Sequence, residues 1–265
     1  MATEIRDRFR ELHARERLFV MPNPWDLGSA RLLESLGFEA LATTSSGFAA
    51  SLGRLDQRVS RDELVEHVRA VTGAVSIPVN VDSENCFPHE PGGVAETVRL
   101  LAAAGAAGCS IEDYDPVADR IEDFDVAVAR VGEAVGAGSG VVLTARCENL
   151  LHGVRDLDDT IARLVAYRDA GADCVYAPGL RDLGEVARVV DAVGVPVNVL
   201  LLPEGPSTLE LESVGVRRAS TGGLLAWAAY GALVRGAREL LEHGTSTYAQ
   251  GRVTPDELRA AFDSD

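Results

Sequence analysis

One pattern of hydrophobic and polar positions recurs along the chain: an amphipathic helical stretch, a glycine, and then a short run of β-forming residues. It appears in residues 32–44, 100–113, 167–179 and 211–223. In chain order the glycine is Gly37, Gly105, Gly171 or Gly215. A glycine at this place is typical of a helix that ends in a left-handed residue. The pattern therefore predicts helices that end at glycine and lead directly into strands.

Eight short apolar runs are the strand candidates. They span residues 18–22, 39–44, 77–82, 108–113, 141–146, 173–178, 195–200 and 216–221. Amphipathic helical patterns separate them, and such alternation favours a parallel sheet covered by helices. Eight units predict an α/β fold, the closed (β/α)8 TIM barrel. An open doubly wound sheet is the alternative, although no GxGxxG motif follows the first strand, which disfavours its dinucleotide-binding version.

The chain is expected to form a single (β/α)8-barrel domain over residues 1–265, with residues 222–265 as a C-terminal helical extension. This extension holds a long apolar helical stretch and a short helix that begins at Thr254 and Pro255. It either packs against the bottom of the barrel or is exchanged with a partner subunit, because Trp227 and Tyr230 give it an adhesive face. A homo-oligomer, dimer or tetramer, is the corresponding expectation.

Composition excludes several classes of function. A formal net charge of -16 argues against nucleic acid as a partner, because phosphate binding needs clustered basic residues. No apolar stretch is long enough to cross a membrane, and the charged N-terminal stretch lacks a signal core, so we expect a cytoplasmic protein. Four cysteines without a CxxC pair fit a reducing compartment. All 25 basic residues are arginine, which excludes imine chemistry through a lysine.

Acidic residues end two neighbouring predicted strands, where the active site of a barrel lies. Asp82 and Glu84 end the third strand, and Glu112 ends the fourth. A cluster of carboxylate oxygens suits a hard cation such as Mg²⁺ or Mn²⁺. The alternative is that these acids only cap the helices that follow. Three acids together favour the metal site, because like charges repel one another without a cation.

Candidate groups for a small carboxylate substrate end the other strands. Arg146 ends the fifth strand and could bind a carboxylate through two parallel hydrogen bonds, or could pair with Glu112 or Glu148. The run 43–51 after the second strand offers hydroxyl and backbone N–H groups near a helix start, and Asn198 ends the seventh strand. Because the whole chain is acidic, an anionic substrate needs such local positive charge.

The order of these residues resembles the isocitrate lyase/phosphoenolpyruvate mutase superfamily, and more closely its phosphonomutase-like members. The resemblance runs from about Pro22 to Ser220 and is carried by residues 22–51, 78–85, 105–113, 143–150 and 167–179. It implies a TIM barrel that binds Mg²⁺ and a 2-oxo acid, with a pyruvate enolate released as a C–C or P–C bond breaks. It also implies that Asp82, Glu84 and Glu112 hold the metal, with Glu84 in place of the usual Asp.

The same resemblance implies the residues around the substrate. They are Trp25 and Asp26 after the first strand, Ser45, Ser46, Gly47 and Phe48 after the second, and Arg146 after the fifth. Arg146, Asp82 and Glu112 are the candidate catalytic residues. Asn198 is added to the substrate-binding set from its strand-end position alone.

The chain departs from the family in the segment that follows the fourth strand. Lyases of the family carry a loop there with Cys and His, and mutases carry Lys and Asn, but residues 114–125 read YDPVADRIEDFD. The leading hypothesis is a Mg²⁺-dependent lyase that cleaves or decarboxylates a small 2-oxo or 2-hydroxy acid, since this chemistry needs least from the loop. Phosphonopyruvate mutase or P–C hydrolase chemistry is one alternative. A 2-oxo acid binding protein without turnover is the other.

Overall fold

Eight parallel strands form the inner wall of the structure. The computed structural model describes residues 2–263, and within them the barrel strands are β1 (Phe19–Met21), β2 (Leu41–Ala42), β3 (Val79–Asp82), β4 (Gly108–Glu112), β7 (Val142–Arg146), β8 (Cys174–Tyr176), β9 (Val197–Leu200) and β10 (Arg218–Ser220). Their order in the sheet is β1-β10-β9-β8-β7-β4-β3-β2. Each lies inside one of the eight predicted runs, so the predicted strands are confirmed.

The sheet curves round until its two edge strands meet. The N–H of Ala42 in β2 donates to the carbonyl of Pro22 after β1 at 3.1 Å. Beside it, Asn23 Nδ2 donates to the carbonyl of Thr43 at 2.7 Å. These two hydrogen bonds join the edges, and the predicted (β/α)8 barrel is confirmed rather than the open sheet.

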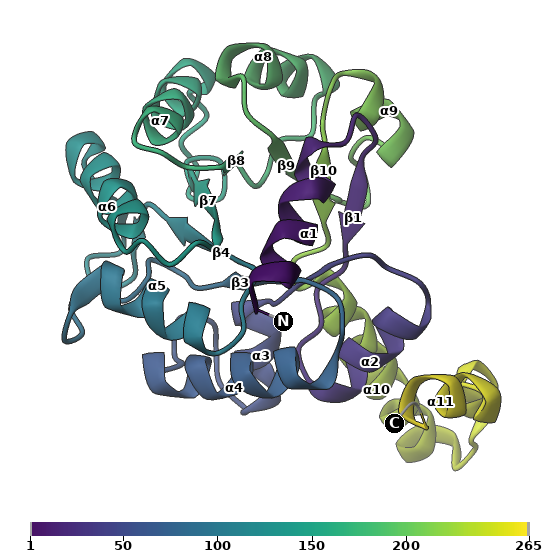
Figure 1. The fold of residues 1–265 in the computed structure, drawn as a ribbon. Coiled ribbons are helices and arrows are strands. Elements are labelled where there is room, and N and C mark those ends of the chain that lie inside the picture. The colour runs from purple at the N-terminus through teal and green to yellow at the C-terminus, as the bar shows by residue number, and fades with distance from the viewer. Residues whose placement is uncertain (1, 264–265) are drawn as a thin grey trace.

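Helices surround the strands in a ring, as Figure 1 shows. In chain order they are α2 (Leu27–Ser35), α3 (Ser45–Ser51), α4 (Arg61–Ala74), α5 (Gly93–Ala103), α6 (Phe124–Gly136), α7 (Leu157–Asp169), α8 (Leu183–Val193) and α9 (Thr208–Ser213). The four glycines of the recurring pattern all have positive φ angles, between 89° and 105°. At Gly105 a side chain is excluded twice, because φ is +98° and a Cβ would lie 2.8 Å from Thr72 Oγ1.

Helix α1 (Ala2–Ala14) lies across one end of the barrel in Figure 1. Its residues Phe9 and Leu12 are fully buried and pack against Phe19 and Val142, the first residues of β1 and β7. These contacts place α1 over the amino ends of the strands. The helix therefore closes the floor of the barrel and leaves the opposite end for the site.

Two parts of the chain lie outside the alternation of strand and helix. The segment after β4 forms a small antiparallel hairpin, β5 (Tyr114–Asp115) and β6 (Arg120–Ile121), which the hydrophobic pattern did not predict. The C-terminal extension forms α10 (Leu224–His243), the 3₁₀ helix η1 (Thr247–Gly251) and α11 (Pro255–Phe262), and α11 begins where it was predicted. In Figure 1 this extension projects from the barrel beside α2. None of the helices in residues 2–263 is both long enough and apolar enough to span a membrane.

Candidate active site

A cavity of about 190 Å³ lies inside the barrel at the carboxyl ends of the strands. Residues from β2, β3, β7, β9 and β10, or directly after them, line it. They include Ser45, Ser46, Asp82, Arg146, Asn198 and Arg218. The cavity is small beside the pockets that hold drug-sized ligands, so its size suits a small acid.

Arg146, at the end of β7, is the centre of the site. Its guanidinium pairs with three carboxylates: Asp82 Oδ1 at 2.8 Å, Glu112 Oε2 at 3.2 Å and Glu148 Oε1 at 2.9 Å. The guanidinium also lies over the ring of Tyr176, with 5.4 Å between its carbon and the ring centroid. Burial alone would lower the pKa of Arg146, but the three carboxylates raise it far above its ordinary value. The arginine is a permanent cation that holds three strand ends together.

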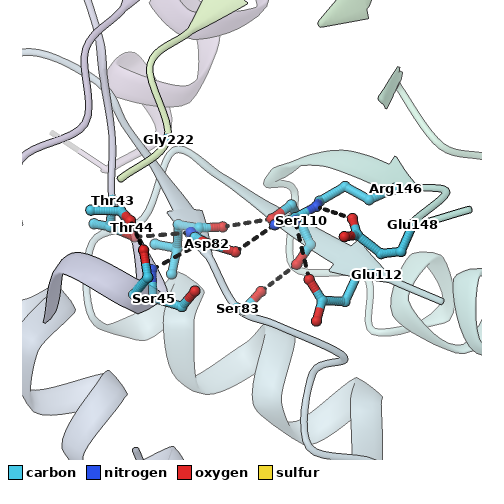
Figure 2. A network of polar contacts seen from close by, with 12 residues as sticks. Thr43, Thr44, Ser45, Asp82, Ser83, Ser110, Glu112, Arg146, Glu148 and Gly222 are labelled. Carbon is cyan, nitrogen blue, oxygen red and sulfur yellow. Dashed lines mark hydrogen bonds and ion pairs between the residues drawn. The ribbon is translucent and has the colours of Figure 1, made fainter. Parts of the chain in front are cut away.

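Asp82 connects this arginine to the turn after β2. Its Oδ2 accepts the N–H of Ser45 at 3.0 Å, and its own N–H donates to Thr43 Oγ1 at 2.9 Å. Figure 2 shows Asp82 between Thr43, Thr44 and Ser45 on one side and Arg146 on the other. The acid is therefore fixed by a backbone donor and an arginine together, which is a stronger constraint than either one alone.

The acids around Arg146 outnumber it. Burial, together with the nearby charges of Asp82 and Asp56, raises the pKa of Glu84 to about 8. Burial also raises the pKa of Glu112, against the attraction of Arg146. Enclosure by the cavity wall and the charge of Asp82 raise the pKa of Asp56. In each of these acids burial, and after it neighbouring negative charge, disfavours the charged form, and a cation would offset both effects.

The donor chemistry fits a hard divalent cation. Asp56, Asp82, Glu84 and Glu112 offer carboxylate oxygens only, the ligands that Mg²⁺ and Mn²⁺ prefer. Within residues 2–263 no three His, Cys, Asp or Glu side chains converge as a metal site, and Asp82 and Glu112 are turned toward Arg146 instead. A cation would therefore compete with the guanidinium for the same oxygens.

The structure brings together about half of the residues predicted from the sequence. Ser45, Ser46, Asp82, Arg146 and Asn198 line the cavity. Glu112 reaches the site through its ion pair with Arg146, and its Oε1 accepts from Gln57 Nε2 at 2.8 Å. The salt bridges of Arg146 to Glu112 and Glu148, which were the alternative to substrate binding, are both present.

The other predicted residues do not line the cavity. Asp26 caps α2 by accepting from Ser29 N at 2.7 Å. Phe48 stacks on His67 with ring centroids 3.8 Å apart. Gly47 is buried behind the turn, where a Cβ would lie 3.0 Å from Trp25 Cβ, so close packing alone requires glycine there. Glu84 is buried, has a left-handed φ of 51° and does not line the cavity.

Several polar residues of the cavity were given no role from the sequence, and three of them carry an ionisable group. Asp56 lies in the turn after α3, Tyr176 ends β8 and Arg218 begins β10. Asp56 was missed because candidate site residues were sought at strand ends, and it lies in a turn. Side chains alternate between the two faces of a strand. This alternation along Cys174–Tyr176 could have indicated that Tyr176 points inward.

Comparison with known proteins gives the family. The model of the family described as phosphoenolpyruvate phosphomutase matches residues 9–241. An oxaloacetate decarboxylase of Paraburkholderia xenovorans is 33% identical over 211 residues, which cover 76% of this chain and 70% of the relative. A solved Burkholderia cenocepacia J2315 protein, regarded as a lyase/mutase, is 50% identical with a TM-score of 0.94, and the match covers 99% of this chain and 98% of that one.

A more distant structure shares the fold. Phosphonopyruvate hydrolase, solved with oxalate and Mg²⁺, has a TM-score of 0.83 at 21% identity, over 96% of this chain and 93% of its own. The family match spans most of the chain, and its relatives act on small acids as lyases, mutases or hydrolases. The chain belongs to the phosphoenolpyruvate phosphomutase family, within the PEP mutase/isocitrate lyase superfamily.

Proposed function

We propose that the protein is a Mg²⁺-dependent lyase that acts on a small 2-oxo or 2-hydroxy acid through a pyruvate enolate, by C–C cleavage or decarboxylation. The observation that carries the proposal is the excess of carboxylates around a single arginine at the strand ends. An acidic site that must also take an anionic substrate needs a cation between the two. Sequence identity of 33% with an oxaloacetate decarboxylase, over 76% of this chain, supports the reaction class.

Asp82, Glu84 and Glu112 are the proposed metal-holding residues, and we add Asp56, whose pKa is raised by burial and by the charge of Asp82. When bound, Mg²⁺ supplies electrophilic stabilisation of the negative charge that develops on the enolate oxygen. The raised pKa values of Glu84 and Glu112 are consistent with this assignment, because burial and neighbouring acids disfavour their charged forms and a bound cation would favour them.

The remaining proposed roles belong to substrate binding and orientation. Ser45 and Ser46 offer hydroxyl groups in the cavity wall, and Arg146 offers a guanidinium at the strand ends. Gly47, Phe48, Trp25 and Asp26 belong to the proposed substrate-binding set, although they do not line the cavity. Arg146 is the proposed carboxylate-binding and catalytic residue, and a cation that took over its acids would free its donors for the substrate.

Two other functions are separated from this one by their products. Phosphonopyruvate or phosphoenolpyruvate mutase and P–C hydrolase chemistry would use the same metal and enolate. A non-catalytic 2-oxo acid binding protein would keep the cavity without turnover. The hairpin β5–β6 lacks the Cys and His of the family's lyase loop and the Lys and Asn of its mutase loop. It therefore favours neither the loop-dependent lyase chemistry nor the mutase chemistry.

The proposal includes a homo-oligomer. Helix α10 leaves Trp227, Leu233 and Leu241 exposed, at 49%, 66% and 87%. Large apolar side chains on one helix mark an interaction surface, and a second copy of this chain is the occupant that the projecting extension fits. Light scattering should give a dimer or tetramer, and Leu233→Glu with Leu241→Glu should give monomers. A monomeric wild type would contradict this part.

A single assay tests the proposed reaction. Wild-type protein with Mg²⁺ is supplied with a panel of 2-oxo, 2-hydroxy and phosphono acids, and release of pyruvate, CO₂ and phosphate is followed. We expect pyruvate or a homologous 2-oxo acid without phosphate. The Asp82→Asn protein, which keeps the size of the side chain, should lose this activity. Phosphate release would favour the P–C hydrolase, and tight oxalate binding without any product would favour the binding protein.

A further inference from the structure

A second arginine lies inside the barrel, below the acidic rim. Arg218, the first residue of β10, is 2% exposed, and it lines the same cavity as Arg146 and Asp82. Its Nε donates to Asn198 Oδ1 at 2.9 Å, and its Nη1 lies 3.1 Å from His13 Nε2 on α1. Because α1 closes the floor, Arg218 stands where the cavity is deepest.

The surroundings of Arg218 contrast with those of Arg146. Arg146 has three carboxylate partners, whereas none of the ion pairs formed by residues 2–263 includes Arg218. Its two recorded partners are a neutral amide and an imidazole. Burial lowers the pKa of His13 to about 3, with Arg218 adding to the shift, so the imidazole is neutral at pH 7. Arginine keeps its charge even when buried. The cavity floor therefore holds a cation without a counter-ion.

A buried charge without a partner destabilises the protein, and an anion in the cavity would offset this effect. Asn80 lines the same cavity, and its buried Oδ1 has no hydrogen-bond partner. The wall around Arg218 is therefore polar, and Arg218 is the group in it whose charge calls for an anion.

The register of the sheet connects this floor to the rim. In the parallel sheet Arg218 lies in register with Asn198 of the next strand, Asn198 with Tyr176, and Tyr176 with Arg146. All four side chains line the cavity. A ligand that lies along this wall meets the rim groups at one end and Arg218 at the other.

We propose that Arg218 is a specificity-determining residue that binds a second carboxylate of the substrate, so that the protein selects small diacids over the corresponding monoacids. This rests on the proposed function, in which the rim holds the reacting 2-oxo or 2-hydroxy acid end. Asn198 and His13 position the guanidinium and, being neutral, leave its charge for the ligand.

Malate and lactate test this directly, because lactate is malate without the distal carboxylate. Titration calorimetry with Mg²⁺ measures racemic malate, racemic lactate and oxalate, a mimic of the pyruvate enolate that has no further anionic arm. We expect wild type to bind malate at least ~10-fold more tightly than lactate, as a charge-assisted contact contributes. Arg218→Gln should abolish this preference and leave oxalate affinity unchanged, and Arg218→Lys should restore part of it. Arg217→Gln, next in sequence, is the matched control and should behave as wild type.

A second variant covers the case in which Arg218→Gln does not fold. Asn198→Asp is isosteric and places a permanent counter-ion beside Arg218, 2.9 Å from its Nε, so the malate preference should disappear while the melting temperature does not fall. Equal affinity of wild type for malate and lactate, with oxalate bound, overturns the role of Arg218 and leaves the proposed function standing. Loss of oxalate binding and turnover in wild type, with the malate preference kept and Arg218-dependent, overturns the proposed function alone.

Discussion

Arg146 Nη1 lies 2.8 Å from Asp82 Oδ1, while the other oxygen of Asp82 accepts the N–H of Ser45. Asp82, a proposed metal ligand, therefore also fixes Arg146, which is proposed to bind the substrate carboxylate. It fixes in addition the turn that holds Ser45. Binding a cation at Asp82 would change the hydrogen bonding of all three at once. Metal and substrate affinity should consequently depend on each other.

Replacing Arg146 by lysine tests whether the planar guanidinium is needed. An ammonium group cannot meet Asp82, Glu112 and Glu148 in the same geometry, so buried carboxylates lose their partner. We expect Arg146→Lys to lower the free energy of unfolding by ~3 kcal/mol without Mg²⁺. Its oxalate dissociation constant should rise on the order of tenfold, measured by calorimetry with Mg²⁺. Arg217→Lys serves as the control. Unchanged oxalate affinity would mean that Arg146 only holds the acids together.

The metal assignment predicts a thermal shift. A cation that binds the folded state alone stabilises it by mass action, by ~2.7 kcal/mol at a hundred times its dissociation constant. For a chain of this size that raises Tm by about 5 °C or more, measured by scanning calorimetry. Asp82→Ala should remain folded and lose the Mg²⁺ response, whereas Asp169→Ala, on the exposed surface, should keep it. Equal shifts in wild type and Asp82→Ala would place the cation elsewhere.

His13 gives the protein a pH dependence of stability. Its pKa is lowered in the folded state to about 3, chiefly by burial and then by Arg218, whereas the unfolded chain has the ordinary value of 6.5. As pH falls below 6.5 the unfolded state binds a proton that the folded state does not bind. The contribution of His13 to the free energy of unfolding is therefore fully present above pH 6.5 and is lost toward pH 3. At pH 5 this loss is on the order of 1–2 kcal/mol.

Urea unfolding at pH 8 and pH 5 checks this value. Other groups also titrate, so the comparison is between wild type and His13→Gln, which keeps a polar group and removes the titration. The drop in unfolding free energy between the two pH values should be smaller in His13→Gln by the amount given above. Identical drops in the two proteins would show that His13 does not carry the effect.

The local pattern of the chain was sufficient to predict the barrel, because each unit repeats the same sequence signal. Gly105 and Gly171 mark helix ends by a backbone conformation that other residues avoid, and the strands follow at once. The hairpin β5–β6 was not predicted, because each of its strands has only two residues. Its base is held by a contact that no local pattern shows, the N–H of Glu122 donating to the carbonyl of Asp113 at 2.7 Å.

The candidate site was predictable only at strand ends. Asp82 and Arg146 follow apolar runs, so their position at the mouth could be inferred. That one arginine serves three acids depends on the register of β3, β4 and β7, which the sequence does not specify. Asp56 lies in a turn without a strand signal, and the burial of Arg218 depends on α1, more than two hundred residues away in the chain.

The hairpin after β4 gives the last prediction. Its polar groups are occupied within the hairpin or at its base: Tyr114 Oη donates to Asp119 Oδ1 at 2.6 Å, Asp115 accepts two backbone N–H groups, and Arg120 pairs with Asp123. The hydrogen bond to Asp119 raises the pKa of Tyr114 to about 12, which makes it a poor proton donor near neutrality.

Replacing Tyr114, Asp115 or Arg120 by alanine should therefore lower turnover of the best acid in the panel by no more than ~10²-fold, the low end of a general acid–base contribution. Each rate is compared with that of Val117→Ala, a change at an exposed apolar residue of the same hairpin. Oxalate affinity, measured on each variant, separates loss of catalysis from loss of binding. A decarboxylase should show this modest effect, because Mg²⁺ and Arg146 stabilise the enolate without the loop. Turnover that vanishes in one variant while oxalate still binds would instead identify that side chain as a proton donor or acceptor, as a C–C lyase or mutase requires.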